Sequence, residues 1–407
     1  MVVNQTSTKL DNKQYVKIKV MILGVILSII VFVLILTIIV FVHELGHFYF
    51  AKKFGVKVHE FGLGLPPRAV GKTVGETIYS LNWLPLGGFV SLKGEEYNEE
   101  EYQNKDQDSF LNKKPWQKAV ILVAGVFMNI IFGILAFQLF LGMNGYKSQE
   151  FLELSNNDYK FGVVKSIPNT IGGFSEDSPA EKSGLRLDDR VVALMYQGES
   201  VRPTNIDELR SFLQDKSDKT VQITVNRPAE ENATLTFNIV PTAAEDTGHG
   251  TIGVYLNSLA MFDYTNNKIM AGVYHSFNML DYTFSTLGHL IGISVKEGDI
   301  QPVASSVSGP LGVLGVVNVI LNLDNGMVFS SLLNLFGLIS ISLAVMNLLP
   351  IPALDGGRLV FTLYEAVTGK LPNPKLEGVL VKWSFLFLIG LMILVTIKDV
   401  FMLPQFF

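Results

Sequence analysis

The amino-acid sequence predicts a multi-pass α-helical membrane protein with about four transmembrane helices, a membrane-associated β-rich loop and one inserted α+β domain. Composition and pattern both support this fold class. Of the 407 residues, 48% are hydrophobic and only 17% are charged, whereas a soluble domain usually carries about 25% charged residues. Long uncharged runs recur along the chain, and such runs can cross about 30 Å of hydrocarbon as helices.

The first uncharged run covers residues 20–42 and leads directly into a histidine motif at residues 43–47. It is too long for the apolar core of a signal peptide, which has about 7–15 residues. We therefore expect a first transmembrane helix over residues 20–54. Residues 1–19 are polar and irregular, and they predict a disordered N-terminal extension.

Three further spans are expected. The last is the weakest, because only residues 383–397 are free of charge. Lys382 and Lys398 can extend this run to spanning length by directing their ammonium groups toward the membrane surface. The predicted ranges are 118–146 for the second helix, 327–366 for the third helix region and 376–403 for the fourth helix.

The segments between the spans differ in character. Residues 55–95 combine short apolar runs with Gly and Pro turns and predict the membrane-associated β-rich loop, followed by a polar loop at 96–117. Residues 160–243 predict the α+β domain, with a capped helix at 206–213. Residues 265–322 are partly apolar but carry histidine and aspartate, which favours interfacial helices and a loop over a further span.

Charge and cysteine content narrow the function and the orientation. A net charge of -5 without a basic stripe gives no indication of nucleic-acid binding, and the absence of cysteine excludes disulfides and thiol catalysis. Segment 49–118 is rich in Lys and Arg, which favours the cytoplasmic side, although four lysines before residue 20 argue for the opposite arrangement. We expect a protein of the cell (inner or plasma) membrane whose inserted domain is extracytoplasmic.

The residues that end the first apolar run fit the pattern H-E-x-x-H. Because residues four apart share a helix face, His43 and His47 can bind one metal ion, and Glu44 can reach a water beside it. A catalytic zinc keeps three protein ligands and one open position, and it activates a water that a glutamate deprotonates. Ionisable residues at membrane depth are costly and are functional by default. The motif therefore predicts a Zn²⁺ site near the cytoplasmic side.

A third ligand is expected where the third apolar run ends. Residues 347–357 contain two prolines one residue apart, which forbid a regular helix, and two glycines, which allow a tight turn. Irregular backbone at membrane depth is tolerated where it is buried in protein or lines a wet cavity. Asp355 in this segment would complete a His₂Asp zinc site, chemically close to His₂Glu.

The pair of motifs H-E-L-G-H and N-x-x-P-x-P-x-L-D-G-G, in this order along a chain of spans, resembles the site-2 protease family of intramembrane zinc metalloproteases. It is most similar to the bacterial regulator-of-sigma-E protease type. The resemblance implies a metalloendopeptidase that cleaves transmembrane segments of single-span, membrane-bound regulators, for example anti-sigma-factor-like proteins, in regulated intramembrane proteolysis.

The same resemblance implies roles for individual residues. His43, His47 and Asp355 would bind Zn²⁺, and Glu44 would be the general base. Asn347 would hold the substrate backbone or the developing oxyanion, a role that suits a donating amide. Alternatively, Asn347 satisfies the carbonyl groups that the prolines leave free.

Two segments are candidates for substrate binding. The resemblance also implies that the β-rich loop offers an edge strand to an unwound substrate, and strand addition presents peptide bonds in extended form. The candidate edge residues are Phe89, Val90 and Ser91, with an internal strand as the alternative.

Residues 178–192 resemble the core of a PDZ domain, and the chain has room for one such domain where family members often carry two. Phe161, Gly162 and Val163 are the expected groove residues for peptide binding. The preceding loop lacks a clean Gly-Leu-Gly-Phe, and a purely steric role of the domain is the alternative.

Two other functions use the same features. A zinc transporter could pass ions over the same ligands, but it would need polar sites across the bilayer, and the other predicted helices hold few. A catalytically silent scaffold could present the PDZ domain. The glutamate beside the first ligand favours hydrolysis over both, so the expected partners are single-span membrane protein substrates and the lipid bilayer.

Overall fold

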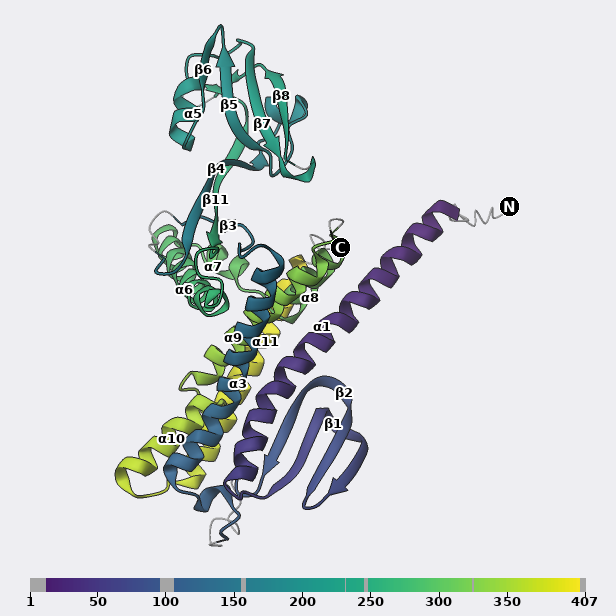
Figure 1. Cartoon of the computed structure of the whole chain (residues 1–407), viewed down its shortest axis with the longest axis vertical. Helices are drawn as coiled ribbons and strands as arrows, with labels where there is room; N and C mark the ends of the chain where they lie inside the picture. Colours follow the sequence, from purple (N-terminus) through teal and green to yellow (C-terminus); the bar gives the residue numbers. More distant parts are fainter. Residues whose placement is uncertain are drawn as a thin grey trace, which may run out of the picture. The chain divides into compact units, whose positions relative to one another are not determined.

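The computed structural model describes residues 12–95, 106–154, 159–230, 232–244, 248–323 and 326–402. The chain divides into two compact units. Unit 1 combines Met1–Met143 with Gly272–Phe407, and unit 2 comprises Asn144–Ala271. Unit 1 contains the long helices together with β1 and β2, whereas unit 2 is mostly β-structure (Figure 1). Unit 2 is therefore an insertion between two parts of unit 1.

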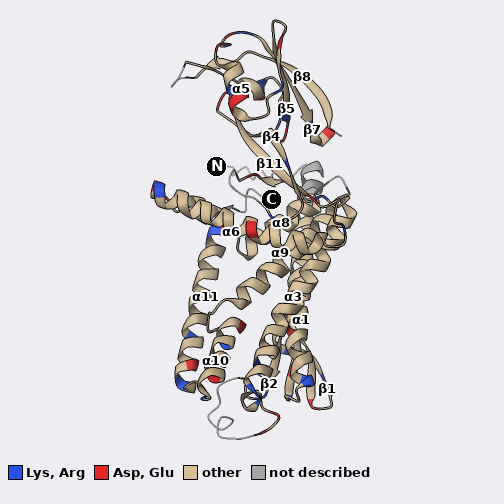
Figure 2. Ribbon diagram, turned by 60° about the vertical axis from the view of Figure 1, so that its left-hand side comes forward, with Lys and Arg blue, Asp and Glu red and all other residues tan. Residues whose placement is uncertain are grey.

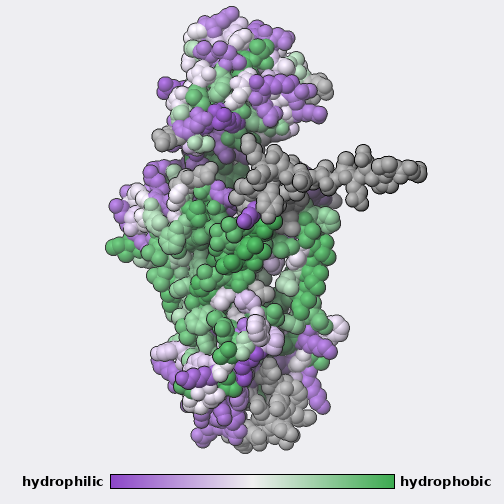
Figure 3. Space-filling model, turned by 90° about the vertical axis from the view of Figure 1, so that its right-hand side faces the viewer, coloured by the Kyte–Doolittle hydropathy of each residue, from purple (hydrophilic) through white to green (hydrophobic). Residues whose placement is uncertain are grey.

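Among the described residues, four helices are long and apolar enough to cross a membrane, which confirms the predicted number. On the face shown in Figure 3, hydrophobic side chains dominate the middle of unit 1, and the long helices expose many large hydrophobic residues. Lys, Arg, Asp and Glu gather at the end of unit 1 that holds α10 and β1 (Figure 2). This distribution suits helices whose outer surface faces lipid. The four helices are α1 (Asn12–Lys53), α3 (Pro115–Met143), α9 (Val328–Leu348) and α11 (Pro374–Met402).

Helix α1 is longer than the sequence predicts. Residues 12–19, which were expected to be disordered, form its first turns. The expectation is wrong for these residues because Lys and Gln are good helix formers and continue a helix that the apolar run has already nucleated. Residues 1–11 lie outside the described residues, as do residues 96–105 of the predicted polar loop.

Glycines allow the helices of unit 1 to approach closely. A Cβ on Gly46 of α1 would stand 2.4 Å from the carbonyl oxygen of Ala124 in α3. A Cβ on Gly133 of α3 would stand 2.7 Å from the Ile341 side chain in α9. In a membrane, where helices gain little from the hydrophobic effect, such close backbone packing drives their association. Helix α3 is thus packed between α1 and α9.

The β-rich part of unit 1 consists of β1 (Val58–Val74) and β2 (Thr77–Leu92), which pair antiparallel and both bend back on themselves. Residues 60–63 of β1 pair with residues 88–91 on one side and with residues 78–81 on the other. Within the described chain, the end of β2 pairs only with the start of β1. Residues 88–92 therefore form an edge of this sheet.

The remaining elements of unit 1 are shorter or more polar. Helix α6 runs across the direction of α3 and α11 (Figure 2) and exposes Phe284, Ile291 and Val295. Helix α8 is held to α11 by Asp399, whose Oδ2 accepts the Gly312 backbone N–H at 2.8 Å. These elements are η1 (Phe110–Asn112), α6 (Ala271–Glu297), α7 (Gln301–Ser306), α8 (Pro310–Leu321) and α10 (Asp355–Thr368).

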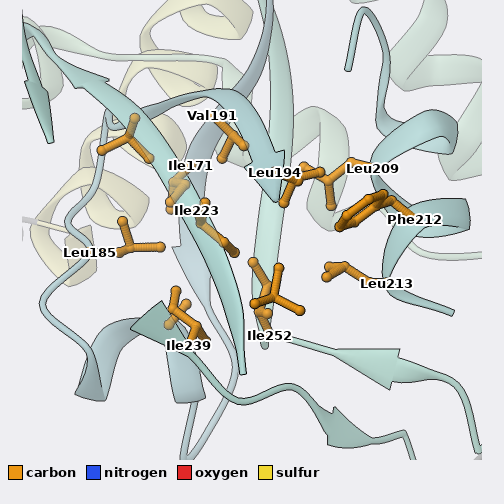
Figure 4. Close-up of a cluster of buried hydrophobic side chains, with 13 residues drawn as sticks. Ile171, Leu185, Val191, Leu194, Leu209, Phe212, Leu213, Ile223, Ile239 and Ile252 are labelled. Atoms are coloured by element: carbon orange, nitrogen blue, oxygen red, sulfur yellow. The ribbon is translucent and has the colours of Figure 1, made fainter. Parts of the chain in front are cut away.

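Unit 2 is built on a seven-stranded sheet in the order β3-β11-β4-β5-β7-β8, with β6 paired to β5. Apolar side chains from β4, β5, β7, β8 and α5 form its core (Figure 4). Its elements are β3 (Phe151–Leu152), β4 (Val163–Phe174), α4 (Pro179–Lys182), β5 (Arg190–Tyr196), β6 (Glu199–Val201), α5 (Ile206–Leu213), β7 (Val221–Arg227), η2 (Pro228–Glu230), β8 (Ala233–Ile239), β9 (Thr242–Ala243), β10 (Gly250–Thr251) and β11 (Val254–Asp263).

Two local features stabilise unit 2. Helix α5 begins and ends where the sequence predicts, because the Asn205 side chain accepts the Glu208 backbone N–H at 2.9 Å and caps it. Arg227 forms a two-pronged ion pair with Asp189, with both bonds at 2.8 Å and the Asp189 side chain fully buried. Such bidentate pairing compensates for the loss of hydration of both groups.

Candidate metal centre

The two histidines of the first motif lie on one face of α1, one helical turn apart. Both are buried, with 6% exposure each. The Nε2 atoms of His43 and His47 are 3.1 Å apart. Glu44 occupies the next position round the helix and is half-buried. The helical repeat alone therefore brings both imidazoles to one point.

Asp355 reaches the same point from the other end of the chain. Helix α9 ends at Leu348, the proline segment follows, and α10 begins at Asp355. A Cβ on Gly356 would stand 2.3 Å from the carbonyl oxygen of Leu348, and one on Gly357 would stand 2.2 Å from that of Ile351. Only glycine fits such close backbone packing, so the two glycines allow the tight turn that brings the carboxylate inward.

The ligand atoms of the three residues converge. Asp355 Oδ2 lies 3.0 Å from His43 Nε2 and 3.3 Å from His47 Nε2. Ligands bound to zinc at about 2.0–2.1 Å in a tetrahedron stand about 3.3 Å from one another. The separations therefore fit a single ion of this size, and two imidazoles with one carboxylate are a donor set that zinc accepts.

A backbone carbonyl fixes which nitrogen of His47 faces the ligand cluster. His47 Nδ1 lies 2.8 Å from the carbonyl oxygen of Ile121 in α3. A carbonyl only accepts, so Nδ1 carries the proton and Nε2 presents its lone pair to the cluster. This is the usual outer partner of a metal-binding histidine, which sets ring orientation and tautomer.

Asn129 of α3 is a site residue that the sequence analysis missed. Its amide nitrogen lies 3.4 Å from His43 Nδ1, and its Oδ1 is buried without a hydrogen-bond partner. Turning the amide over would place this oxygen against the ring N–H of His43 and satisfy both groups. A polar residue inside the second apolar run was the available signal, since such residues in membrane helices tend to be functional.

We expect Asn129→Ala to weaken zinc binding about 10–100-fold, because outer partners of metal-binding histidines contribute by that factor. Zinc affinity measured by competition with a chromogenic chelator checks this. Ser340→Ala is the matched control, since the Ser340 hydroxyl donates to the Asn129 backbone carbonyl, at 2.8 Å, and not to the Asn129 side chain. Equal zinc affinity in Asn129→Ala and wild type would contradict the assignment.

Asn347 and the end of β2 flank the ligand cluster. The Asn347 amide nitrogen lies 3.3 Å from His43 Nε2. A Cβ on Gly88 of β2 would stand 3.8 Å from Glu44 Cγ. Phe89, which follows Gly88, begins the edge segment that the sequence nominated for substrate binding. Glu44 therefore lies between the ligand cluster and the sheet edge.

The second nominated segment lies elsewhere. Val163 starts β4 and pairs with Asp263 at one end of the sheet of unit 2, and Gly162 packs against the Tyr264 ring. The large cavity of unit 2, about 770 Å³, is bounded instead by α5 and by residues 249–257. Phe161, Gly162 and Val163 do not line it.

Comparison with known proteins gives consistent matches over nearly the whole chain. A model of peptidase family M50 matches residues 31–391. A protein of Fusobacterium nucleatum named as a zinc metalloprotease is 31% identical, covering 89% of this chain and 95% of that protein. A similarly named protein of Clostridium perfringens is 30% identical, covering 88% and 94%. Zinc metalloprotease RasP of Shouchella clausii is 28% identical, covering 88% and 95%.

Proposed function

Since this chain belongs to peptidase family M50 and is an intramembrane zinc protease, we propose that His43, His47 and Asp355 hold its zinc ion and that it cleaves membrane-spanning segments of other proteins. The observation that carries this assignment is the convergence of three buried ligand atoms at the end of a membrane-spanning helix. Hydrolysis at this place requires that a substrate helix unwind beside the site.

The zinc ion and the residues around the ligand cluster have different roles in the proposed reaction. Zinc held by His43, His47 and Asp355 would act as a Lewis acid that activates a water and polarises the substrate carbonyl. Glu44 accepts the proton of the attacking water at its carboxylate and returns it to the leaving amine. Asn347 donates its amide N–H to the substrate carbonyl, and its alternative role is to satisfy backbone carbonyls at the proline break.

The edge of the β1–β2 sheet is the proposed receptor for the unwound substrate. Phe89, Val90 and Ser91 belong to the edge segment, and Gly88 immediately before them packs beside Glu44. A substrate added to this edge would present extended peptide bonds next to the general base. A helical substrate would keep its carbonyls hydrogen-bonded and shielded.

Unit 2 is proposed to be a PDZ-type module that binds peptide in the cavity beside α5. In the described chain, residues 254–257 of β11 pair only with β4, so their other edge faces the cavity. Ile206, Leu209 and Ile252 form an apolar part of the cavity lining, which also contains polar residues such as Arg210 and His249. Strand addition to β11 with an apolar side chain inserted between these residues is the mode that fits.

We expect Ile206→Glu to abolish binding of fluorescent peptides with an apolar C-terminal residue, because it would place a carboxylate in the apolar part of the cavity lining. Fluorescence anisotropy with the full chain in detergent measures this. Glu199→Gln, outside the cavity lining, is the control. If neither the wild type nor the control binds any peptide, unit 2 acts only as a steric barrier.

The proposed arrangement places the ligand cluster near the cytoplasmic side of the cell membrane and unit 2 outside the cytoplasm, because the Lys- and Arg-rich segments adjoin the cluster's end of unit 1. The substrates are then single-span membrane proteins, such as membrane-bound regulators. Cleavage would release a fragment on the cytoplasmic side.

A direct test uses the purified chain in phospholipid vesicles with fluorescent single-span peptides. We expect cleavage within the spanning segment, its loss on treatment with a zinc chelator, and recovery on addition of zinc but not of magnesium, which prefers six oxygen ligands. Cleavage that persists at full rate in metal-free protein would refute the zinc site. Cleavage confined to residues outside the bilayer would refute the substrate class.

A further inference from the structure

A single glutamate connects the substrate edge of the β-sheet with the helix that carries the third ligand. Glu95 follows the end of β2, and its Oε2 accepts the Leu92 backbone N–H at 3.3 Å. Its Oε1 forms an ion pair with the Arg358 guanidinium of α10. Arg358 stands three residues after Asp355, about one helical turn along. Two polar bonds therefore span from the sheet edge to the helix of Asp355.

The same junction has an apolar side. Leu92 is buried in a cluster that also holds Ile121 of α3, and Val90 and Leu359 pack against it. Leu359 is the neighbour of Arg358, and the carbonyl of Ile121 is the acceptor for His47 Nδ1. The edge segment, a partner of one ligand and the helix of another thus share one core. Close packing of this kind transmits displacements rather than absorbing them.

The Glu95–Arg358 ion pair is partly shielded from solvent. The two side chains are 21% and 29% exposed. Burial lowers the pKa of Arg358, whereas the negative charges of Glu95 and Asp355 raise it. Together the charges have the larger effect, so the pKa of Arg358 is raised above its ordinary value. The planar guanidinium of Arg358 is more rigid than the ammonium end of a lysine, which suits a fixed connection to the Glu95 carboxylate.

We propose that Glu95 and Arg358 are positioning residues that set the register between the substrate strand and the metal ligands, and thereby select the peptide bond that is cut. This inference rests on the proposed function of residues 89–91 as the substrate edge. A strand advances about 3.3 Å per residue. If the substrate strand slips by two residues along the sheet edge, each of its side chains still points to the same side of the sheet, so the side-chain pattern alone does not prevent the slip. Selecting one bond therefore requires the sheet edge and the ligands to be fixed relative to each other within a few ångströms.

The test compares cleavage products of Glu95→Gln, Arg358→Gln and wild type in vesicles, using a single-span peptide that the wild type cleaves. We expect the variants to keep zinc but to cut at neighbouring bonds as well, which mass spectrometry of the products detects. Turnover at the original bond is expected to fall by up to about 10²-fold, the effect of a misplacement near 1 Å. The exchanged pair, Glu95→Arg with Arg358→Glu, should restore part of the original product pattern.

A second ion pair in the same region provides the control. Lys118 of α3 contacts Glu365 of α10 at 2.7 Å, with side chains 3% and 15% exposed, and it too ties α10 to a neighbouring element. Within the described part of the chain, this pair joins α10 to α3 and not to β2. The double variant Lys118→Met with Glu365→Gln should lower thermal stability without adding new cleavage products.

Two results would overturn the inference. The first is an unchanged product pattern in both glutamine variants, with turnover within about twofold of wild type. The second is the same new products in the Lys118 and Glu365 control, since general loosening of α10 would then explain them. If a glutamine variant loses zinc, the product pattern of Arg358→Lys is compared with that of wild type instead. This variant keeps the positive charge but lacks the planar guanidinium group. Failure of the wild type to cut any spanning peptide would instead count against the proposed function.

Discussion

Replacing Glu44 with glutamine is expected to lower the turnover number about 10²–10⁴-fold, the range that a general base contributes, while zinc remains bound. Glutamine has nearly the same shape, and Glu44 is not among the converging ligand atoms. It cannot take the proton of the attacking water, so the loss falls on the chemical step. The Michaelis constant should change little, because binding of the substrate strand does not use the lost proton acceptor.

Turnover and zinc content of the purified variant measure this effect, and Glu76→Gln, an exposed glutamate in the turn between β1 and β2, is its control. In cells, membrane proteins with an uncut span should accumulate in the Glu44→Gln strain. A variant that holds full zinc and keeps more than a tenth of wild-type turnover would place the base elsewhere. Zinc transport that falls in this variant without any peptide cleavage in wild type would favour a transporter.

The second large effect is expected at Gly125. A Cβ there would stand 2.4 Å from His47 Nε2 and 2.8 Å from His43 Cε1, well inside van der Waals contact. His47 is held on its other side by the Ile121 carbonyl, so its ring cannot move away without losing that bond. Gly125→Ala should therefore displace the imidazoles, reduce zinc from about one per chain to a small fraction, and abolish cleavage.

Zinc content and peptide cleavage test this prediction, with thermal unfolding to show that the helices remain folded. Gly390→Ala in α11 is the matched control, because a Cβ at Gly390 meets no atom within 4 Å. That change should leave zinc and turnover intact and slightly favour the helix, since alanine is the better helix former. Full zinc in Gly125→Ala would show that the imidazoles tolerate the methyl group.

Some structural features followed from the sequence because their causes are local. The spacing of His43 and His47 needs only the helical repeat, and the four spans need only length and apolarity. The cap of α5 follows from Asn205 and the residues after it. The two prolines before Asp355 likewise predicted that the helix ends and that the chain turns toward the protein interior.

Other features depend on contacts between distant segments. Val163 was nominated for the peptide groove from a motif in one stretch of chain, whereas the cavity beside α5 is bounded by residues 249–257, which only the sheet order brings there. The edge position of Phe89 also needed the register of β1 and β2. A strand's neighbours are not encoded in its own alternation pattern.

The sequence by itself determined the candidate ligands, the helix that carries two of them, and the apolar helices long enough to span a membrane. Only the tertiary structure decided that the Asp355 carboxylate meets both imidazoles, that Asn129 and the Ile121 carbonyl adjoin their outer nitrogens, and that Glu95 joins the sheet edge to α10. The reason is physical: helix periodicity and hydropathy act over a few residues, whereas these contacts form only when packed helices bring distant segments together.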